Sequence, residues 1–290
     1  MKLLRTFAPL GAAVFAVVSA FPVQEETKSL DELHAEALKE GGKVVIYHGG
    51  DYDAQQASTV NAFREAYPDI NLTMVVDYSK YHDVRIDNQL ATDSLVPDIV
   101  ALQTLQDFTR WTKKDKLLKY KPAGFSEIYE PFKDESGAKT RAQKPEFNRG
   151  SHKAGEAVSE KRKTIGVAGS GPWTAKTLRG NGTDFLVWGQ RIAILKKAKR
   201  PAAANFFLNW IISKDVQNTL FASWGVSPRK DVLPPSGQHL WEADGASTPL
   251  FPKFMEDRAK VEQLKATFAL YSGEVRGEPS PGQLGLHPGA

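Results

Sequence analysis

The 290-residue chain contains no cysteine. Disulfides, thiolate catalysis, cysteine-based zinc sites and iron–sulfur clusters are therefore excluded. The chain also lacks the His-Glu-x-x-His, Gly-x-Ser-x-Gly, Walker and dinucleotide-binding glycine motifs, and no acidic pair stands out for acid–base catalysis. These absences favour a protein that is not an enzyme. A secreted hydrolase with an unrecognised active site remains the alternative.

A strong excess of charge of either sign is also missing. The formal net charge is +4, and removing the positive charges of Lys2 and Arg5 with an N-terminal signal leaves +2. That value is too small to indicate binding to nucleic acid or to a membrane surface. Hydrophobic residues at 41% and charged residues at 25% are ordinary for a globular protein.

The longest apolar run covers residues 7–18, which is too short for a comfortable membrane span. Positive charges precede it, and the small residues Val18-Ser19-Ala20 follow it. This pattern predicts a secretion signal over residues 1–20, cleaved after Ala20. We therefore expect a secreted, extracellular monomer that does not span the membrane. The sequons at Asn71 and Asn181 predict glycosylation if the source is eukaryotic.

Apolar strands alternate with amphipathic helices in the first half of the chain. After a helix over 30–40, the pattern predicts strands over 43–48, 70–76 and 97–102 and helices over 53–67, 80–91 and 104–114. This order predicts an α/β fold with a parallel sheet, in a first lobe over residues 28–138.

The second half is less regular. Residues 139–183 show little apolar periodicity and are expected to be a poorly ordered remnant or linker. Residues 184–272 are expected to be mainly helical, and residues 273–290 to form a flexible tail. The expected helices cover 202–213, with Pro201 at its first position, 214–224 and 249–271.

Polar residues follow each predicted strand, where parallel sheets bind ligands. The candidate ligand-binding residues after the first three strands are His48, Gly49, Gly50, Asp51, Tyr78, Ser79, Lys80, Tyr81 and Gln103. Gly49 and Gly50 could offer backbone N–H groups to an anion, and Lys80 and Arg85 could add positive charge. A plain tight turn at the glycines is the alternative interpretation.

Two further interpretations apply to these turns. Ser79 is expected to cap the helix that follows the second strand, and this helix face could equally be solvated, with Tyr81 packed on the core. His48 and Asp51 are candidate metal ligands, since imidazole and carboxylate both suit iron or zinc. The alternative for them is a polar pair in which Asp51 caps the next helix.

The chain resembles the extracellular solute-binding proteins of iron(III)-type ABC transport systems, and more closely their secreted fungal homologues. The resemblance covers residues 28–138 and 184–288. It is carried by the stretches Val44–Asp51, Val76–Asp87, Asp98–Asp107, Trp188–Lys196, Pro201–Gln217 and Ser227–Val232. It implies a periplasmic-binding-protein-like fold of two lobes, a small anion or iron-type chelate as ligand and a membrane transporter as partner. It also places Trp188 and Gln190 near the cleft.

The sequence departs from this family in two places. Most of the second lobe should lie between Asp134 and Asp184, so the resemblance implies a truncated second lobe, through a deletion, an alternative transcript or a gene-model error. A non-binding truncated isoform is therefore a third possibility. The neutral Gln103 replaces a carboxylate, and no tyrosine occurs between Tyr129 and Tyr271 to supply the family's tyrosine pair. Direct iron binding is accordingly disfavoured, and no cofactor is expected.

Overall fold

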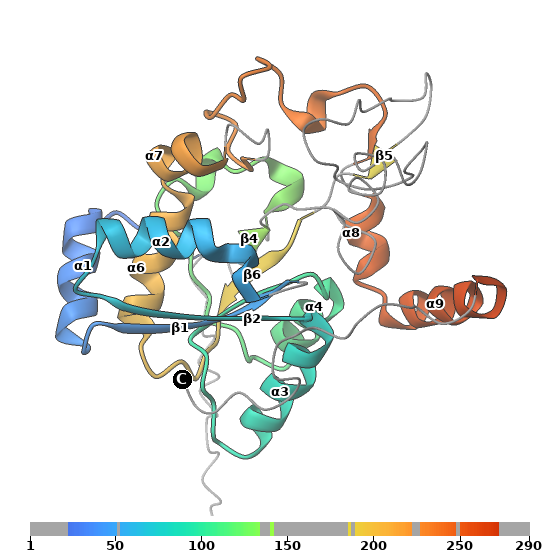
Figure 1. The fold of residues 1–290 in the computed structure, drawn as a ribbon, viewed down its shortest axis with the longest axis horizontal. Coiled ribbons are helices and arrows are strands. Elements are labelled where there is room, and N and C mark those ends of the chain that lie inside the picture. Colours follow the sequence, from blue (N-terminus) through green and yellow to red (C-terminus); the bar gives the residue numbers. More distant parts are fainter. Residues whose placement is uncertain are drawn as a thin grey trace, which may run out of the picture.

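The computed structural model describes residues 23–50, 53–133, 140–141, 185–186, 189–221, 227–247 and 250–272. Their centre is a five-stranded sheet of order β2-β1-β3-β6-β4 (Figure 1). The strands are β1 (Lys43–Gly49), β2 (Asn71–Asp77), β3 (Ile99–Leu102), β4 (Thr140–Arg141) and β6 (Arg191–Ile194). β1 pairs in parallel with β2 and β3, whereas β6 runs antiparallel to β3 and β4.

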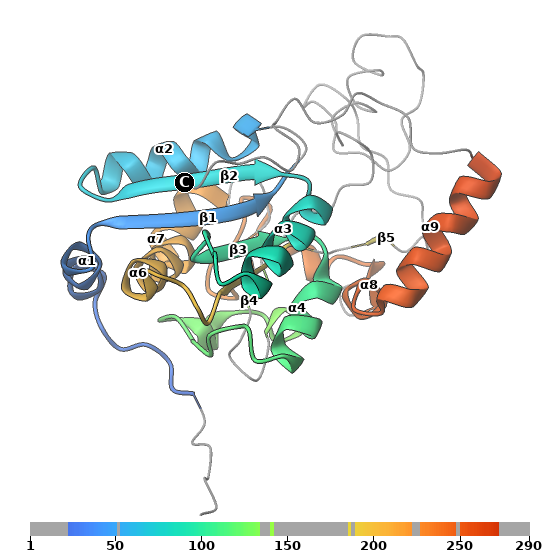
Figure 2. The same cartoon turned by 90° about the horizontal axis from the view of Figure 1, so that it is seen from below.

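The central strand β1 is apolar on both faces because helices cover both faces of the sheet. Along β1, Val44 and Ile46 belong to one buried cluster, while Val45 and Tyr47 belong to another. The first cluster is completed by α1 (Leu30–Lys39), α2 (Ala57–Ala66) and α6 (Pro201–Ile212), and the second by α3 (Ser79–Ala91) and α4 (Leu105–Lys113). Figure 1 shows α2 and α3 on opposite sides of β1 and β2, and Figure 2 shows β2, β1 and β3 side by side.

Local sequence signals define several helix ends. Ser29 and Glu32 form a capping box at the start of α1. Gly41 and Gly42, with φ of 107° and 60°, end this helix in a conformation that glycine adopts without strain. Pro201 occupies the first turn of α6, as predicted.

Three predicted helices are interrupted. The stretch expected to be one helix over 53–67 is a 3-10 turn, η1 (Asp53–Gln56), followed by α2. The stretch over 214–224 contains α7 (Lys214–Val216) and then a π-helical turn, η4 (Gln217–Phe221). The stretch over 249–271 contains α8 (Leu250–Met255) and α9 (Arg258–Ser272). The reason for this last break is Asp257, whose carboxylate accepts the Lys260 N–H and so starts a new helix.

The remaining elements are short. They are the 3-10 turns η2 (Phe125–Glu127), η3 (Glu130–Phe132) and η6 (Leu240–Glu242), and a parallel pair of β5 (Phe185–Leu186) with β7 (Ala246–Ser247).

The chain after residue 190 returns to the first lobe. β6 lies between β3 and β4 in the sheet, and α6 packs against α1. The boundary predicted at residue 184 therefore divides the chain in sequence, while residues 191–212 share a sheet and a core with the described part of residues 23–133. Within residues 139–183, only Thr140 and Arg141 belong to the described part, where they form β4.

Several predictions fall on residues outside the description. These are the signal over 1–20 with its cleavage after Ala20, the sequon at Asn181, most of 139–183, and the tail over 273–290. Asn71 is described, and it is exposed at the start of β2.

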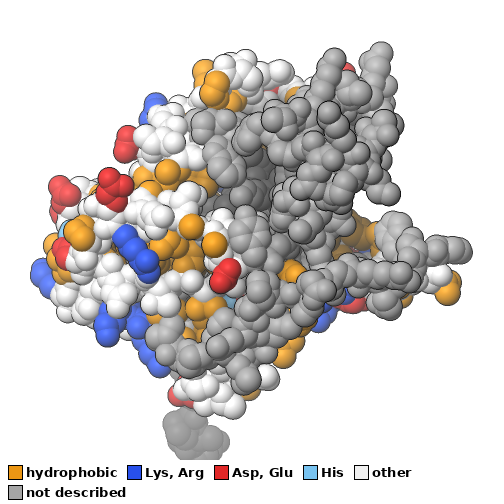
Figure 3. All heavy atoms as spheres, viewed as in Figure 1, with side chains coloured by type: hydrophobic (Ala, Val, Ile, Leu, Met, Phe, Trp, Pro, Cys, Tyr) orange, Lys and Arg blue, Asp and Glu red, His pale blue; other side chains and the backbone are white. Residues whose placement is uncertain are grey.

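No helix within the described residues is long and apolar enough to cross a membrane. In the described part of the face shown in Figure 3, basic and acidic side chains are scattered among neutral ones.

Candidate functional site

The ends of the central strands bring most of the predicted site residues together. In the register of the sheet, Gly49 pairs with Asp77, and Leu102 pairs with Arg191. The turns after β1, β2 and β3 therefore lie at one edge of the sheet, and Gln190 joins them just before β6. The predicted residues at this strand-end site are His48, Gly49, Gly50, Tyr78, Ser79, Lys80, Tyr81, Gln103 and Gln190. Asp51 and Trp188 lie outside the described residues.

Gly49 is required for close packing at this site. A Cβ atom added to Gly49 would lie 2.1 Å from Ser79 Oγ, so the Ser79 side chain or the backbone would have to shift. The Gly49 carbonyl accepts a hydrogen bond of 2.8 Å from Gln190 Nε2 and one of 2.8 Å from His48 Nδ1. Gly49 thus lets the ends of β1, α3 and β6 meet.

Gly50 does not offer the anion-binding N–H group that the sequence suggests. Its N–H donates to the Asp77 carbonyl at 2.9 Å. A Cβ atom at Gly50 would lie 2.4 Å from Val76 Cγ1, so this glycine also permits close packing. These two contacts favour the tight-turn alternative for Gly50.

The prediction that Ser79 caps α3 is wrong. The N-cap is Tyr78, and it makes no capping hydrogen bond through its side chain. Ser79 Oγ instead accepts the backbone N–H of Gln103 at 3.0 Å. The hydroxyl group therefore connects the start of α3 to the end of β3.

Arg85 is not available to an anionic ligand, in contrast to the prediction. It is 9% exposed, and its guanidinium donates to Asp77 Oδ2 at 3.1 Å and contacts His82 Nδ1 at 2.8 Å. His82 stacks on Tyr47 with a centroid distance of 4.7 Å. This internal ion pair neutralises a carboxylate that is itself fully buried.

Lys80 is the exposed cation at the strand-end site. Its Nζ lies 5.0 Å from the centroid of the Tyr81 ring and 5.8 Å from that of Tyr78, and the two rings are 5.7 Å apart. Ring faces attract an ammonium group, so the two half-buried tyrosines hold Lys80 beside the strand ends.

The predicted metal ligands are only partly described. His48 Nδ1 bonds to the Gly49 carbonyl, so this nitrogen carries the ring proton. Within the described residues, no three histidine, aspartate or glutamate side chains come together as a metal site.

A buried acidic cluster beside the site has no sequence signal of its own. Asp83 on α3 and Asp107 on α4 share the guanidinium of Arg110, and Arg258 of α9 lies 3.3 Å from Asp83 and 3.6 Å from Asp107. Burial, and then repulsion from Asp83, raise the pKa of Asp107 to about 6. Because its members come from three distant helices, no spacing rule could have found it.

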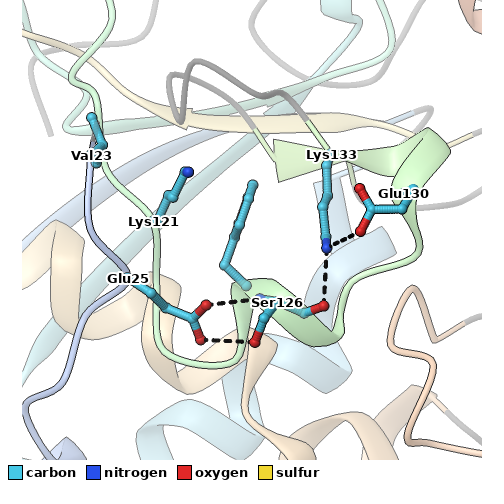
Figure 4. A pocket seen from close by; sticks show the side chains of 7 residues that line it. Val23, Glu25, Lys121, Ser126, Glu130 and Lys133 are labelled. Atoms are coloured by element: carbon cyan, nitrogen blue, oxygen red, sulfur yellow. Dashed lines mark hydrogen bonds and ion pairs between the residues drawn. The ribbon is translucent and has the colours of Figure 1, made fainter. Parts of the chain in front are cut away.

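The structure also contains a pocket of about 340 Å³ whose lining includes none of the strand-end residues (Figure 4). Its lining includes Glu25, Lys121, Phe125 and Lys133. The Glu25 carboxylate accepts the N–H groups of Gly124 and Ser126, at 2.6 Å and 2.9 Å. These bonds attach the N-terminal segment to the stretch around η2, so we assign the pocket lining a structural role.

No family model matches the sequence, and no curated protein matches it. Solved structures do match. The iron-bound HitA protein from Pseudomonas aeruginosa is 13% identical, with a TM-score of 0.54, covering 78% of this chain and 98% of HitA. An ABC-transporter substrate-binding protein from Agrobacterium tumefaciens is 11% identical, with a TM-score of 0.60, covering 77% and 91% of the two chains.

A third match is a Trichodesmium protein, IdiA or FutA, in complex with iron and citrate. It is 10% identical, with a TM-score of 0.52, covering 77% of this chain and 99% of that one. The fold is that of the periplasmic binding proteins. At these identities the likeness shows the fold alone. The expected α/β, periplasmic-binding-protein-like fold is confirmed, and the expected truncation of the second lobe stays a prediction.

Proposed function

We propose that the protein is a secreted, non-enzymatic solute-binding protein that holds a small anion or a metal chelate at the strand-end site. The observation that carries this proposal is the convergence of nine predicted residues, from four separate segments, at the carboxyl ends of β1, β2 and β3. Open α/β sheets bind ligands at that edge. The match to solute-binding proteins supports the same role.

The anionic class follows from the charge at the site. Arg85 is neutralised by Asp77, whereas Lys80 is exposed and makes no ion pair within the described residues. A metal chelate suits the site because its organic part already supplies metal ligands. It then needs only charge and hydrogen bonds from the protein.

Calorimetric titration with citrate, iron(III) citrate and inorganic phosphate tests the proposal. We expect Lys80→Gln to weaken anion binding about five- to tenfold, since it removes the positive charge beside the tyrosine rings. Lys43→Gln is the matched control, because Lys43 is an exposed lysine at the opposite end of β1. Equal loss in both variants, or tight binding that neither Lys80→Gln nor Tyr81→Ala affects, would place the site elsewhere.

The proposal also covers the location of the protein and its partner. Export through the signal over residues 1–20 would deliver the chain as an extracellular monomer, and a membrane transporter would receive its ligand. The absence of heat with every ligand tested would favour the non-binding isoform instead.

A further inference from the structure

Gln190 is a buried amide that extends across the strand ends. It precedes Arg191, the first residue of β6, which pairs with the last residue of β3. Its side chain passes over the end of β3 and donates from Nε2 to the Gly49 carbonyl, at the end of β1, at 2.8 Å. Only 5% of Gln190 is exposed.

The orientation of this amide is determined by its partner. A carbonyl oxygen can only accept a hydrogen bond, so the nitrogen of Gln190 must face Gly49. The oxygen, Oε1, therefore points away from β1. Oε1 is buried and has no hydrogen-bond partner among the residues that the structure describes. A buried acceptor without a partner is costly, and such groups in folded proteins call for an explanation.

Two described backbone donors at the strand ends are already used. The N–H of Gly50 is bonded to Asp77, and the N–H of Gln103 is bonded to Ser79. A hydroxyl group of a bound solute would supply the missing hydrogen for Oε1. Gly49 contacts both Gln190 and Ser79, and Ser79 directly precedes Lys80 in the sequence. The unpaired oxygen of Gln190 and the exposed cation of Lys80 therefore belong to one site.

We infer that Gln190 Oε1 accepts a hydrogen bond from a hydroxyl group of the bound solute, so that the ligand is a hydroxylated small anion. This inference rests on the proposed function and specifies its ligand class. A neutral amide oxygen suits a hydroxyl donor, and the positive charge of Lys80 disfavours an ammonium group at the same site. Hydroxycarboxylates, their chelates and hydroxylated phosphate esters all share this chemistry.

Two ligand pairs that differ only in a hydroxyl group test the inference by calorimetry. Citrate is compared with tricarballylate, and glycerol 3-phosphate with propyl phosphate, using the full mature chain. We expect the hydroxylated member of the pair that binds to do so about tenfold more tightly, because its partner leaves Oε1 unpaired. This comparison uses the wild-type protein and needs no variant.

The variant Gln190→Met then assigns the preference to a residue. It keeps a similar volume and removes the acceptor, so the two members of each pair should bind alike. Gln263→Met, on an exposed part of α9, is the control and should keep the wild-type preference. Equal wild-type affinity within a pair that binds would overturn the inference and leave the proposed function standing. Absence of binding by all four compounds would overturn the inference, and absence of binding by iron(III) citrate and inorganic phosphate as well would overturn the proposed function.

Discussion

At the scale of single residues, several side chains of the strand-end site contact one another and hold the strand ends together. Gly49 admits Ser79, Ser79 holds the backbone of Gln103, and Gln190 closes over the carbonyl of Gly49. The sequence identified these residues because they follow apolar strands. It could not identify their partners, since Gly49 and Gln190 are 141 positions apart.

Replacing Gly49 tests this packing directly. We expect Gly49→Ala to lower the free energy of unfolding by about 2 kcal/mol, because the new methyl group meets Ser79 Oγ in a well-packed region. Ser79→Ala removes that oxygen, so the double variant should lose less stability than the sum of the single changes. Urea denaturation measures all three. Strictly additive losses would show that the two residues do not compete for space.

At the scale of elements, the predicted helices and strands of the first lobe agree closely with the structure. The strand expected over 43–48 is β1 (Lys43–Gly49), and the helix expected over 80–91 is α3 (Ser79–Ala91). Apolar periodicity identifies a strand but says nothing of its direction, which is why the antiparallel insertion of β6 could not be foreseen. Apolar periodicity also continues across the break between α8 and α9, so it did not reveal that α9 begins after the cap residue Asp257.

The acidic cluster between α3, α4 and α9 makes stability depend on pH. The pKa of Asp107 is raised to about 6 in the folded state, mainly by burial, so the folded protein binds a proton that the unfolded chain releases. The contribution of Asp107 to the free energy of unfolding is fully present below about pH 4 and is lost as the pH rises through about 6. The expected loss in the free energy of unfolding is on the order of 3 kcal/mol.

Asp107→Asn isolates this effect because it removes the titration. We expect the stability of the wild type to fall relative to the variant between pH 4 and pH 7, as measured by urea denaturation at several pH values. Asp231→Asn is a suitable control, because the pKa of Asp231 is lowered by Arg229 and its contribution changes in the opposite direction. Parallel curves for wild type and Asp107→Asn would rule out this assignment.

At the scale of the whole molecule, the α/β fold could be predicted from the sequence, whereas the extent of the second lobe could not. Alternating strands and helices pointed to the α/β class, and the matched structures bear it out. The match extends over 98% of HitA. Truncation between Asp134 and Asp184 stays a prediction, since nearly all of that stretch lies outside the described residues. Sequencing the transcript across this interval decides it.

Export of the protein can be tested from its N-terminus. Cleavage after Ala20 would leave Phe21 as the first residue, two positions before Val23, where the described structure begins. Soon after that point, Glu25 bonds to Gly124 and Ser126, and Glu26 N–H donates to the Lys121 carbonyl at 2.8 Å. The attachment of this segment therefore uses residues that remain after cleavage.

We expect N-terminal sequencing of the secreted protein to start at Phe21. A chain produced from Phe21 onward should unfold at the same urea concentration as the secreted protein. A product that retains Met1 and stays with the cells would contradict the prediction of a cleaved signal.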